Sequence, residues 1–146
     1  MNRLNLITLG VRDMVESIRF YRDGLGFDVI VYGSEENPDV AFFKNNGTKI
    51  SLFQIDKLAK DISEEAPPAL NQGFAGITLA YNGKSEEEVD EVFKLAKNAG
   101  AKIVKEPQKV FWGGYSGYFQ DPNGYYWEAA YGETWEFDEN EMLVIN

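Results

Sequence analysis

The sequence predicts an α+β fold made of two βαβββ modules, which form a cupped mixed sheet with the helices on its outer face. Three observations support this prediction. The tripeptide Ile-Thr-Leu occurs at residues 7–9 and again at 77–79. After each copy there follow a capping box, an amphipathic helix and a glycine that ends the helix. Three further runs of strand length come next, in the same order both times. The repeated order indicates an internal duplication within one domain, residues 1–146.

The first module is expected at about residues 1–56. Asp13 and Glu16 form a capping box, so a helix should begin there, and Gly24 should end it. The expected strands of this module are 4–11, 27–32, 40–43 and 49–55. Strand alternation leaves Leu6 and Thr8 on the sheet face that the helix does not cover.

The second module is expected at about residues 73–131, after a linker at 57–72 that carries a short surface helix at 57–62. Its helix should begin at the capping box of Ser85 and Glu88 and end at Gly100. The expected strands are 76–81, one beginning at 102–104, 115–120 and 125–131. The tail, 132–146, is acidic with an apolar end, which suggests docking on its own domain or on a partner subunit.

The last hairpin determines which side chains share a face in the second module. Its turn, Asp121-Pro122-Asn123-Gly124, has the composition of a type I turn. We expect this turn to pair Phe119 with Tyr126 and Gly117 with Glu128. Two curved half-sheets that meet along their helix-free faces would then enclose a cavity lined by apolar, aromatic and small side chains.

The composition excludes several kinds of chemistry. The chain contains no histidine and no cysteine, so it cannot form a disulfide, a thiolate nucleophile, a Cys/His zinc site or an imidazole general base. A formal charge of -10 argues against nucleic acid as a partner. It either keeps the protein in solution or favours neutral or cationic small ligands. We find no secretory signal and no apolar run long enough to span a membrane, so a cytoplasmic location is expected.

Three stretches resemble the glyoxalase / bleomycin-resistance / extradiol-dioxygenase group, the vicinal oxygen chelate superfamily. They are LGVRDMVESIRFYRDGLGF at 9–27, GITLAY at 76–81 and GYFQDPNGYYWEAAY at 117–131. The resemblance covers the chain from the first strand to about Tyr131. It implies a ligand site surrounded by two βαβββ modules and assembly as a homodimer.

The resemblance also identifies where a metal would be held. The metalloenzymes of the superfamily take four ligands from four strands, and carried over by position these fall at Leu6, near Ser51, at Gly76 and at Glu128. Only Glu128 is a carboxylate here. A catalytic metal normally needs three protein ligands, so we expect no metal and no other cofactor.

A metal-free branch of the superfamily, the bleomycin-resistance proteins, consists of acidic dimers that sequester a cationic drug in a groove lined with aromatic side chains. By this resemblance we expect a small-molecule binding protein whose ligand is cationic or aromatic. The candidate ligand-binding residues are Leu6, Thr8, Phe53, Trp112, Tyr115, Phe119, Tyr126 and Glu128.

Two of these candidates each have a structural alternative. Glu128 is either an anchor for a ligand amine or a general base, or else a carboxylate held by a tyrosine hydroxyl or a buried cation. Trp112, in the loop 111–115, is either a lid over the ligand or a side chain packed under the neighbouring subunit.

Two other function classes stay open at this point. One is a lyase or isomerase with Glu128 as catalytic base, dependent on a metal only if unusual ligands hold it. The other is a regulatory or interaction module in which the cavity is merely a core and the tail and linker carry the function.

Overall fold

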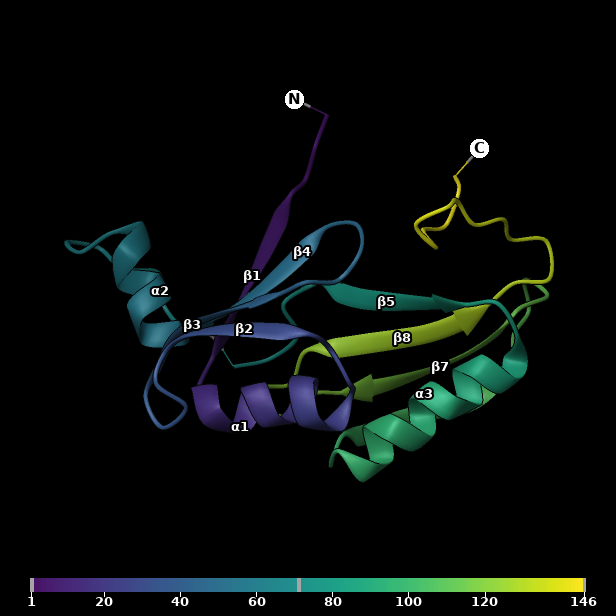
Figure 1. Cartoon of the computed structure of the whole chain (residues 1–146), viewed down its shortest axis with the longest axis horizontal. Coiled ribbons are helices and arrows are strands. Elements are labelled where there is room, and N and C mark those ends of the chain that lie inside the picture. Colours follow the sequence, from purple (N-terminus) through teal and green to yellow (C-terminus); the bar gives the residue numbers. More distant parts are fainter. Residues whose placement is uncertain (1, 71, 146) are drawn as a thin grey trace. The chain divides into compact units, whose positions relative to one another are not determined.

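The computed structural model describes residues 2–70 and 72–145; Asn71, in the expected linker, lies outside the described residues. The chain forms two compact units, Met1–Gly73 and Phe74–Asn146. Each unit is a four-stranded mixed sheet with a helix packed against one face (Figure 1). The predicted fold class, two repeated βαβββ modules, is confirmed.

The first sheet has the strand order β1-β4-β3-β2. β1 runs parallel to β4, and the other neighbours are antiparallel. Its strands are β1 (Leu6–Val11), β2 (Val29–Gly33), β3 (Pro38–Phe43) and β4 (Lys49–Gln54). The parallel pair brings the beginning and the end of the module together, so β1 borders β4 although α1, η1, β2 and β3 separate them in sequence.

The helix of the first unit starts where the capping box predicts. α1 (Met14–Ile18) continues into a π-helical segment, η1 (Arg19–Gly24). The Asp13 side chain accepts a hydrogen bond from the backbone N–H of Glu16 at 2.9 Å, which satisfies one of the free donors of the first turn. Tyr21 is fully buried and meets Phe43 edge to face, with 5.2 Å between ring centroids. This contact fixes the helix against the sheet.

A second helix, α2 (Ile55–Ile62), follows β4 directly, so β4 ends one residue earlier than expected and the helix begins two residues earlier. Ile55 and Leu58 lie on one face of it and pack on Gly10 of β1. A Cβ at Gly10 would lie only 2.9 Å from Cγ1 of Ile55. Because Gly10 alternates with Leu9 and Val11, which are buried on the α1 side, α2 covers the opposite face of this end of the sheet.

The second sheet repeats the topology of the first, with the order β5-β8-β7-β6. Its strands are β5 (Thr78–Gly83), β6 (Lys102–Lys109), β7 (Tyr115–Gln120) and β8 (Tyr126–Tyr131). β5 begins at Thr78 and not at the expected Gly76, because Gly76 adopts a φ of +74°, which no extended strand allows.

The helix of the second unit is α3 (Glu86–Asn98), capped by Ser85 as predicted. Phe93 of α3 is 2% exposed and meets Phe119 of β7 edge to face at 5.7 Å, and Phe119 stacks on Trp127 of β8. Within the described residues, no helix is long and apolar enough to cross a membrane.

The tail folds back on its own unit, one of the two alternatives expected from its composition. Trp135 stacks on Trp112 with 5.8 Å between ring centroids and 14° between the ring planes. Farther along, the Glu141 carboxylate accepts a hydrogen bond from the Lys84 ammonium at 2.7 Å. The two contacts connect residues 132–145 to the loop before β7 and to the segment between β5 and α3.

Candidate functional site

The hairpin between β7 and β8 decides which side chains of the second sheet point away from α3. Its loop is the three residues Pro122-Asn123-Gly124, closed by Asp121, whose N–H donates to the carbonyl of Tyr125 at 3.0 Å. Gly124 has a φ of +89°, the left-handed residue that completes a three-residue hairpin loop. The expected pairing assumes a loop one residue shorter. The strand register therefore differs by one residue, which exchanges the two faces of β7 relative to β8.

The observed pairs are Tyr118 with Glu128 and Phe119 with Trp127, so the predicted pairing of Phe119 with Tyr126 and of Gly117 with Glu128 is wrong. Phe119 is 1% exposed and lies on the α3 side of the sheet. Gly117 lies on that side as well, since a Cβ there would be 2.5 Å from Cζ of Phe93. The placement of Phe119 on the ligand face is therefore wrong.

Tyr115 also faces α3, contrary to the prediction. Its hydroxyl donates a hydrogen bond to Oδ1 of Asp90 at 2.8 Å. This bond, with a smaller contribution from burial and from neighbouring carboxylates, raises the pKa of Tyr115 to about 12. Tyr115 is thus a contact between β7 and α3.

The face of the second sheet opposite α3 carries Tyr126 and Glu128, on the side that the sequence predicted. Tyr118 and Gln120 join them, because Tyr118 stands directly across from Glu128, and Gln120 from Tyr126. Burial raises the pKa of Tyr118, and the negative charge of Glu128 and the hydrogen bond between the two side chains raise it further. Sequence reasoning missed Tyr118 as a candidate site residue. Gly124 was the available signal, because a left-handed glycine there implies a three-residue loop, and that loop places Tyr118 across from Glu128.

An aromatic edge borders this carboxylate–phenol pair. Phe74 meets Tyr126 edge to face, with 5.5 Å between ring centroids, and Phe74 remains 67% exposed. We call the set Phe74, Tyr118, Gln120, Tyr126 and Glu128 the Glu128 face. It combines one carboxylate, two phenols and an amide with an exposed phenyl ring, a combination suited to cations and to flat aromatic groups.

The candidate residues of the first unit, Leu6, Thr8 and Phe53, lie on the face of their own sheet opposite α1, as predicted. Thr8 shares a hydrogen bond with the buried Ser51, with 2.8 Å between the two hydroxyl oxygens. Leu6 is 41% exposed, and Phe53 stands half-buried across from Val40. These side chains offer hydrocarbon and hydroxyl groups and no carboxylate.

Trp112 has a partner within its own unit, the indole of Trp135. Two glycines allow the stack: a Cβ at Gly114 would overlap the ring of Trp112, and one at Gly132 would lie 2.7 Å from the ring of Trp135. Trp112 is 44% exposed, so one part of its surface stays open to solvent. The stack accounts for Trp112 without a neighbouring subunit.

The residues at the four positions suggested as metal ligands are not suited to hold a metal ion. Leu6 is a hydrocarbon, Gly76 has no side chain, and the hydroxyl of Ser51 is engaged with Thr8. Glu128 alone offers a strong oxygen ligand, whereas a divalent ion needs about three. Across residues 2–70 and 72–145 the structure contains no group of three or more Asp, Glu, His or Cys side chains arranged to hold a metal ion.

Comparison with known proteins agrees with this architecture. The chain is 27% identical over 122 residues to the uncharacterized protein YraH of Bacillus subtilis, covering 83% of this chain and 91% of that protein. The crystal structure of a glyoxalase-related enzyme from Fulvimarina pelagi superposes with a TM-score of 0.86 at 26% identity, covering 99% of each chain. A lactoylglutathione lyase from Agrobacterium tumefaciens shares the fold, with a TM-score of 0.68 at 21% identity over 94% of this chain and 98% of that one. Residues 3–129 match the profile of one family, and the chain belongs to it: the glyoxalase/bleomycin resistance protein/dioxygenase superfamily.

Proposed function

We propose that this protein is a metal-free small-molecule binding protein of its superfamily, and that the Glu128 face holds a cationic or aromatic ligand. The observation that carries the proposal is the pairing of Glu128 with Tyr118 on the sheet face opposite α3. The expectations of a homodimer and of a cytoplasmic location are part of the same proposal.

The chemistry of the Glu128 face supports a ligand that carries positive charge. A carboxylate oriented by a tyrosine hydroxyl makes a strong, charge-assisted hydrogen bond to an ammonium or guanidinium group. The rings of Tyr126 and Phe74 would add cation–π or stacking contacts, worth about 0.5–2 kcal/mol each. The formal charge of -10 favours the approach of such a ligand.

The donor set supports a mechanism of binding without a metal. Leu6 and Gly76 stand where the resemblance would require imidazole ligands, and the chain contains no histidine that could replace them. The only strong oxygen ligand among the four positions, Glu128, is then available to the organic ligand itself.

A thermal-shift titration with cationic aromatic compounds, bleomycin among them, tests the proposal. We expect at least one cation to raise the melting temperature, and Glu128→Gln to weaken its binding about tenfold or more, because a hydrogen bond to a charged group is lost. Glu91→Gln, an equal charge change on the exposed surface of α3, is the matched control and should bind normally. The absence of a response to every cation in a broad panel would contradict the proposal.

A lyase or isomerase that uses Glu128 as a base is the second candidate. The neighbouring Tyr118 favours it, because a carboxylate and a phenol side by side can accept and donate a proton during one reaction. The glyoxalase-related enzyme from Fulvimarina pelagi, to which the chain is similar, is consistent with this class. The enzyme reading predicts that Glu128→Gln abolishes turnover of a bound compound while binding persists, whereas the binding reading predicts loss of binding itself.

A further inference from the structure

The sequence contains three asparagines that are followed directly by glycine, in the pairs Asn46-Gly47, Asn82-Gly83 and Asn123-Gly124. In such a pair the backbone nitrogen of the glycine can attack the side-chain amide carbon of the asparagine, because glycine has no Cβ in the way and its backbone rotates freely. The reaction is slow where that N–H is held by a hydrogen bond or where the backbone is fixed in an extended strand. The structure separates the three pairs by these two conditions.

Two of the three pairs are protected by the second sheet. The N–H of Gly124 donates to the carbonyl of Asp121 at 3.1 Å, in the loop before β8. Asn82 and Gly83 lie in β5, where they pair with β8. Ring closure at these positions would first have to break a turn bond or part of the ladder.

The pair Asn46-Gly47 has neither protection. Both residues are exposed in the connection between β3 and β4, where the backbone follows a bend and not a strand. Gly47 has a φ of +71°, and within residues 2–70 and 72–145 its N–H has no hydrogen-bond acceptor. The nitrogen that would attack is therefore free.

The neighbouring Asn45 makes this connection easier to open than a fully bonded turn. Its Nδ2 donates to the carbonyls of Asn46 and Thr48, at 2.7 and 2.8 Å. Its Oδ1 is buried and accepts no hydrogen bond from any described residue. A buried acceptor without a donor raises the free energy of the closed form, and water satisfies it when the connection opens. Local opening gives the backbone of Asn46 the freedom that ring closure needs.

We propose that Asn46 is a site of spontaneous conversion to isoaspartate, a modification that needs no enzyme and no cofactor. Water or a buffer base removes the N–H proton of Gly47, the nitrogen bonds to Cγ of Asn46, and Nδ2 of Asn46 takes up a proton and leaves as ammonia. A water molecule then opens the resulting cyclic imide at one of its two carbonyls. Attack at one carbonyl gives an aspartate, and attack at the other gives an isoaspartate, whose main chain runs through the former side chain.

The conversion would loosen the segment that leads into β1. Oγ1 of Thr48 donates to the carbonyl of Leu4 at 2.9 Å. The N–H of Lys49 donates to the carbonyl of Asn5, also at 2.9 Å. An isoaspartate lengthens the main chain by a methylene group and displaces the carbonyl that accepts from Asn45. We therefore expect the N–H of Lys49 to exchange with solvent about tenfold faster after the conversion.

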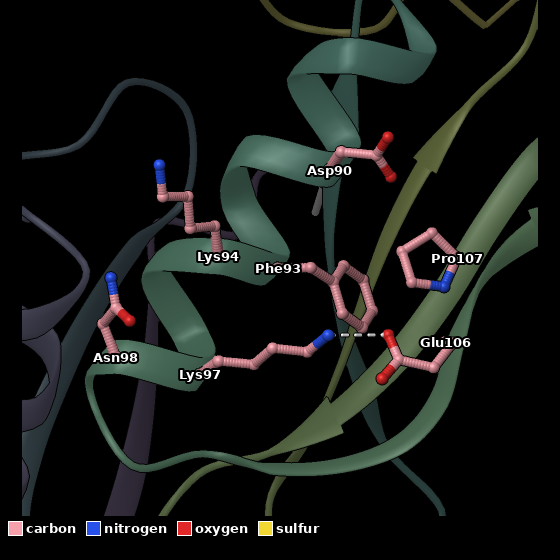
Figure 2. A pocket seen from close by; sticks show the side chains of 7 residues that line it. All are labelled: Asp90, Phe93, Lys94, Lys97, Asn98, Glu106 and Pro107. Carbon is pink, nitrogen blue, oxygen red and sulfur yellow. Dashed lines mark hydrogen bonds and ion pairs between the residues drawn. The ribbon is translucent and has the colours of Figure 1, made fainter.

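Asn98 separates the effect of exposure from that of a free glycine nitrogen. It is exposed on the last turn of α3, and its side chain projects from the helix (Figure 2). The next residue is Ala99, whose N–H donates to the carbonyl of Leu95 at 2.9 Å. Exposure alone predicts conversion at both Asn98 and Asn46, whereas the attack by a free glycine nitrogen predicts it at Asn46.

Incubation of the full chain at mildly alkaline pH tests the proposal, with peptide mass spectrometry that distinguishes isoaspartate from aspartate. We expect isoaspartate to form at Asn46 at least about tenfold faster than at Asn82, Asn98 or Asn123, because the free glycine N–H and the opening bend occur together there. In concentrated urea the two other Asn-Gly pairs should react within about threefold of the rate at Asn46, because the fold no longer protects them. Equal rates at these positions in the folded chain, or faster conversion at any position other than Asn46, would overturn the proposal.

Two variants test the parts played by the glycine and by its N–H. Gly47→Ala should slow the conversion at Asn46 about tenfold or more, because a methyl group hinders the attack and restricts the backbone. Ala99→Gly is the matched control: it creates an exposed Asn-Gly pair at Asn98 whose N–H stays bonded to Leu95, and it should react at least about tenfold more slowly than Asn46. Conversion at Asn98 as fast as at Asn46 in this folded variant would show that the sequence alone determines the rate.

Asn46→Gln tests the structural consequence without altering the glycine. Its longer side chain would have to close a larger ring, so residue 46 should form no isoaspartate during the same incubation. The exchange of the Lys49 N–H, followed by NMR, should then stay constant in this variant and rise in the unmodified sequence. An equal rise in both proteins would contradict the assignment of the loosening to Asn46.

Discussion

The two sheets share one topology but differ in the chemistry of the face opposite their main helix. In the first unit that face shows Leu6, Thr8 and Phe53, with Ser51 bonded to Thr8. In the second unit, the equivalent face carries the Glu128–Tyr118 pair. Duplication thus preserved strand order and core packing. The face of the first sheet also has a phenol, Tyr32, and a charged side chain, Lys49, but the carboxylate paired with a phenol occurs in the second copy. The second unit is the place to look for chemistry.

Each unit buries a phenylalanine almost completely between its helix and its sheet. Removal of either ring should have the largest effect on the free energy of unfolding. Phe43 of β3 and Phe119 of β7 occupy corresponding strands and are 2% and 1% exposed. We expect Phe43→Ala and Phe119→Ala each to lower the free energy of unfolding by about 3–5 kcal/mol, through lost contacts and a cavity. Urea denaturation measures this. A loss of less than about 1 kcal/mol for Phe119→Ala would show that the ring is not packed in the core. That result would favour the pairing of Phe119 with Tyr126 that the sequence predicts.

Gly117 and Gly10, one in each unit, both lie against a helix, but an added side chain would meet different atoms at the two positions. At Gly117 an added Cβ would meet backbone of β6 as well as the ring of Phe93, and backbone cannot move cheaply. At Gly10 it would meet side-chain atoms of Ile55 and Leu58, which can shift. We expect Gly117→Ala to cost about 1–3 kcal/mol and Gly10→Ala less than about 1 kcal/mol. Equal losses in thermal denaturation would contradict this difference between the units.

The smallest effect concerns proton binding at the Glu128 face. The folded chain holds the Tyr118 proton more tightly than the unfolded chain does, because burial and Glu128 raise its pKa. The resulting stabilisation is complete below about pH 10, the pKa of an unfolded tyrosine, and is lost as the pH rises through the folded pKa. Glu128→Gln should lower the pKa of Tyr118 and reduce this loss, as measured by NMR titration of the tyrosine ring carbons.

Tyr115 provides the internal control for that titration. Its pKa of about 12 depends first on Asp90, on the opposite face of the sheet. Asp90→Asn should lower the pKa of Tyr115 and leave Tyr118 unchanged, and Glu128→Gln should do the reverse. If both variants moved both tyrosines equally, the separation of the two faces would be wrong.

The sequence predicted most of the fold because its signals are local. The caps Asp13 and Ser85 act within one helical turn, and β7 begins and ends as the alternation indicates. The candidate site was predicted only in part. Glu128 and Tyr126 lie on the expected face, but Tyr115 and Phe119 do not, because strand register depends on one residue of loop length. The partner of Trp112 was also missed, since Trp135 reaches it only after the chain folds back.

The three-residue loop before β8 has a consequence for how this chain can evolve. The length of this loop decides which side chains of β8 face α3. Removal of one residue from Pro122-Asn123-Gly124 would turn Glu128 toward Phe93 and bring Trp127 to the surface. Substitutions in the hairpin change one side chain at a time, whereas insertion or deletion of one residue there exchanges the core side of the strand for the side that carries Glu128. The number of residues in this turn should therefore be under stronger selection than the identity of most of them.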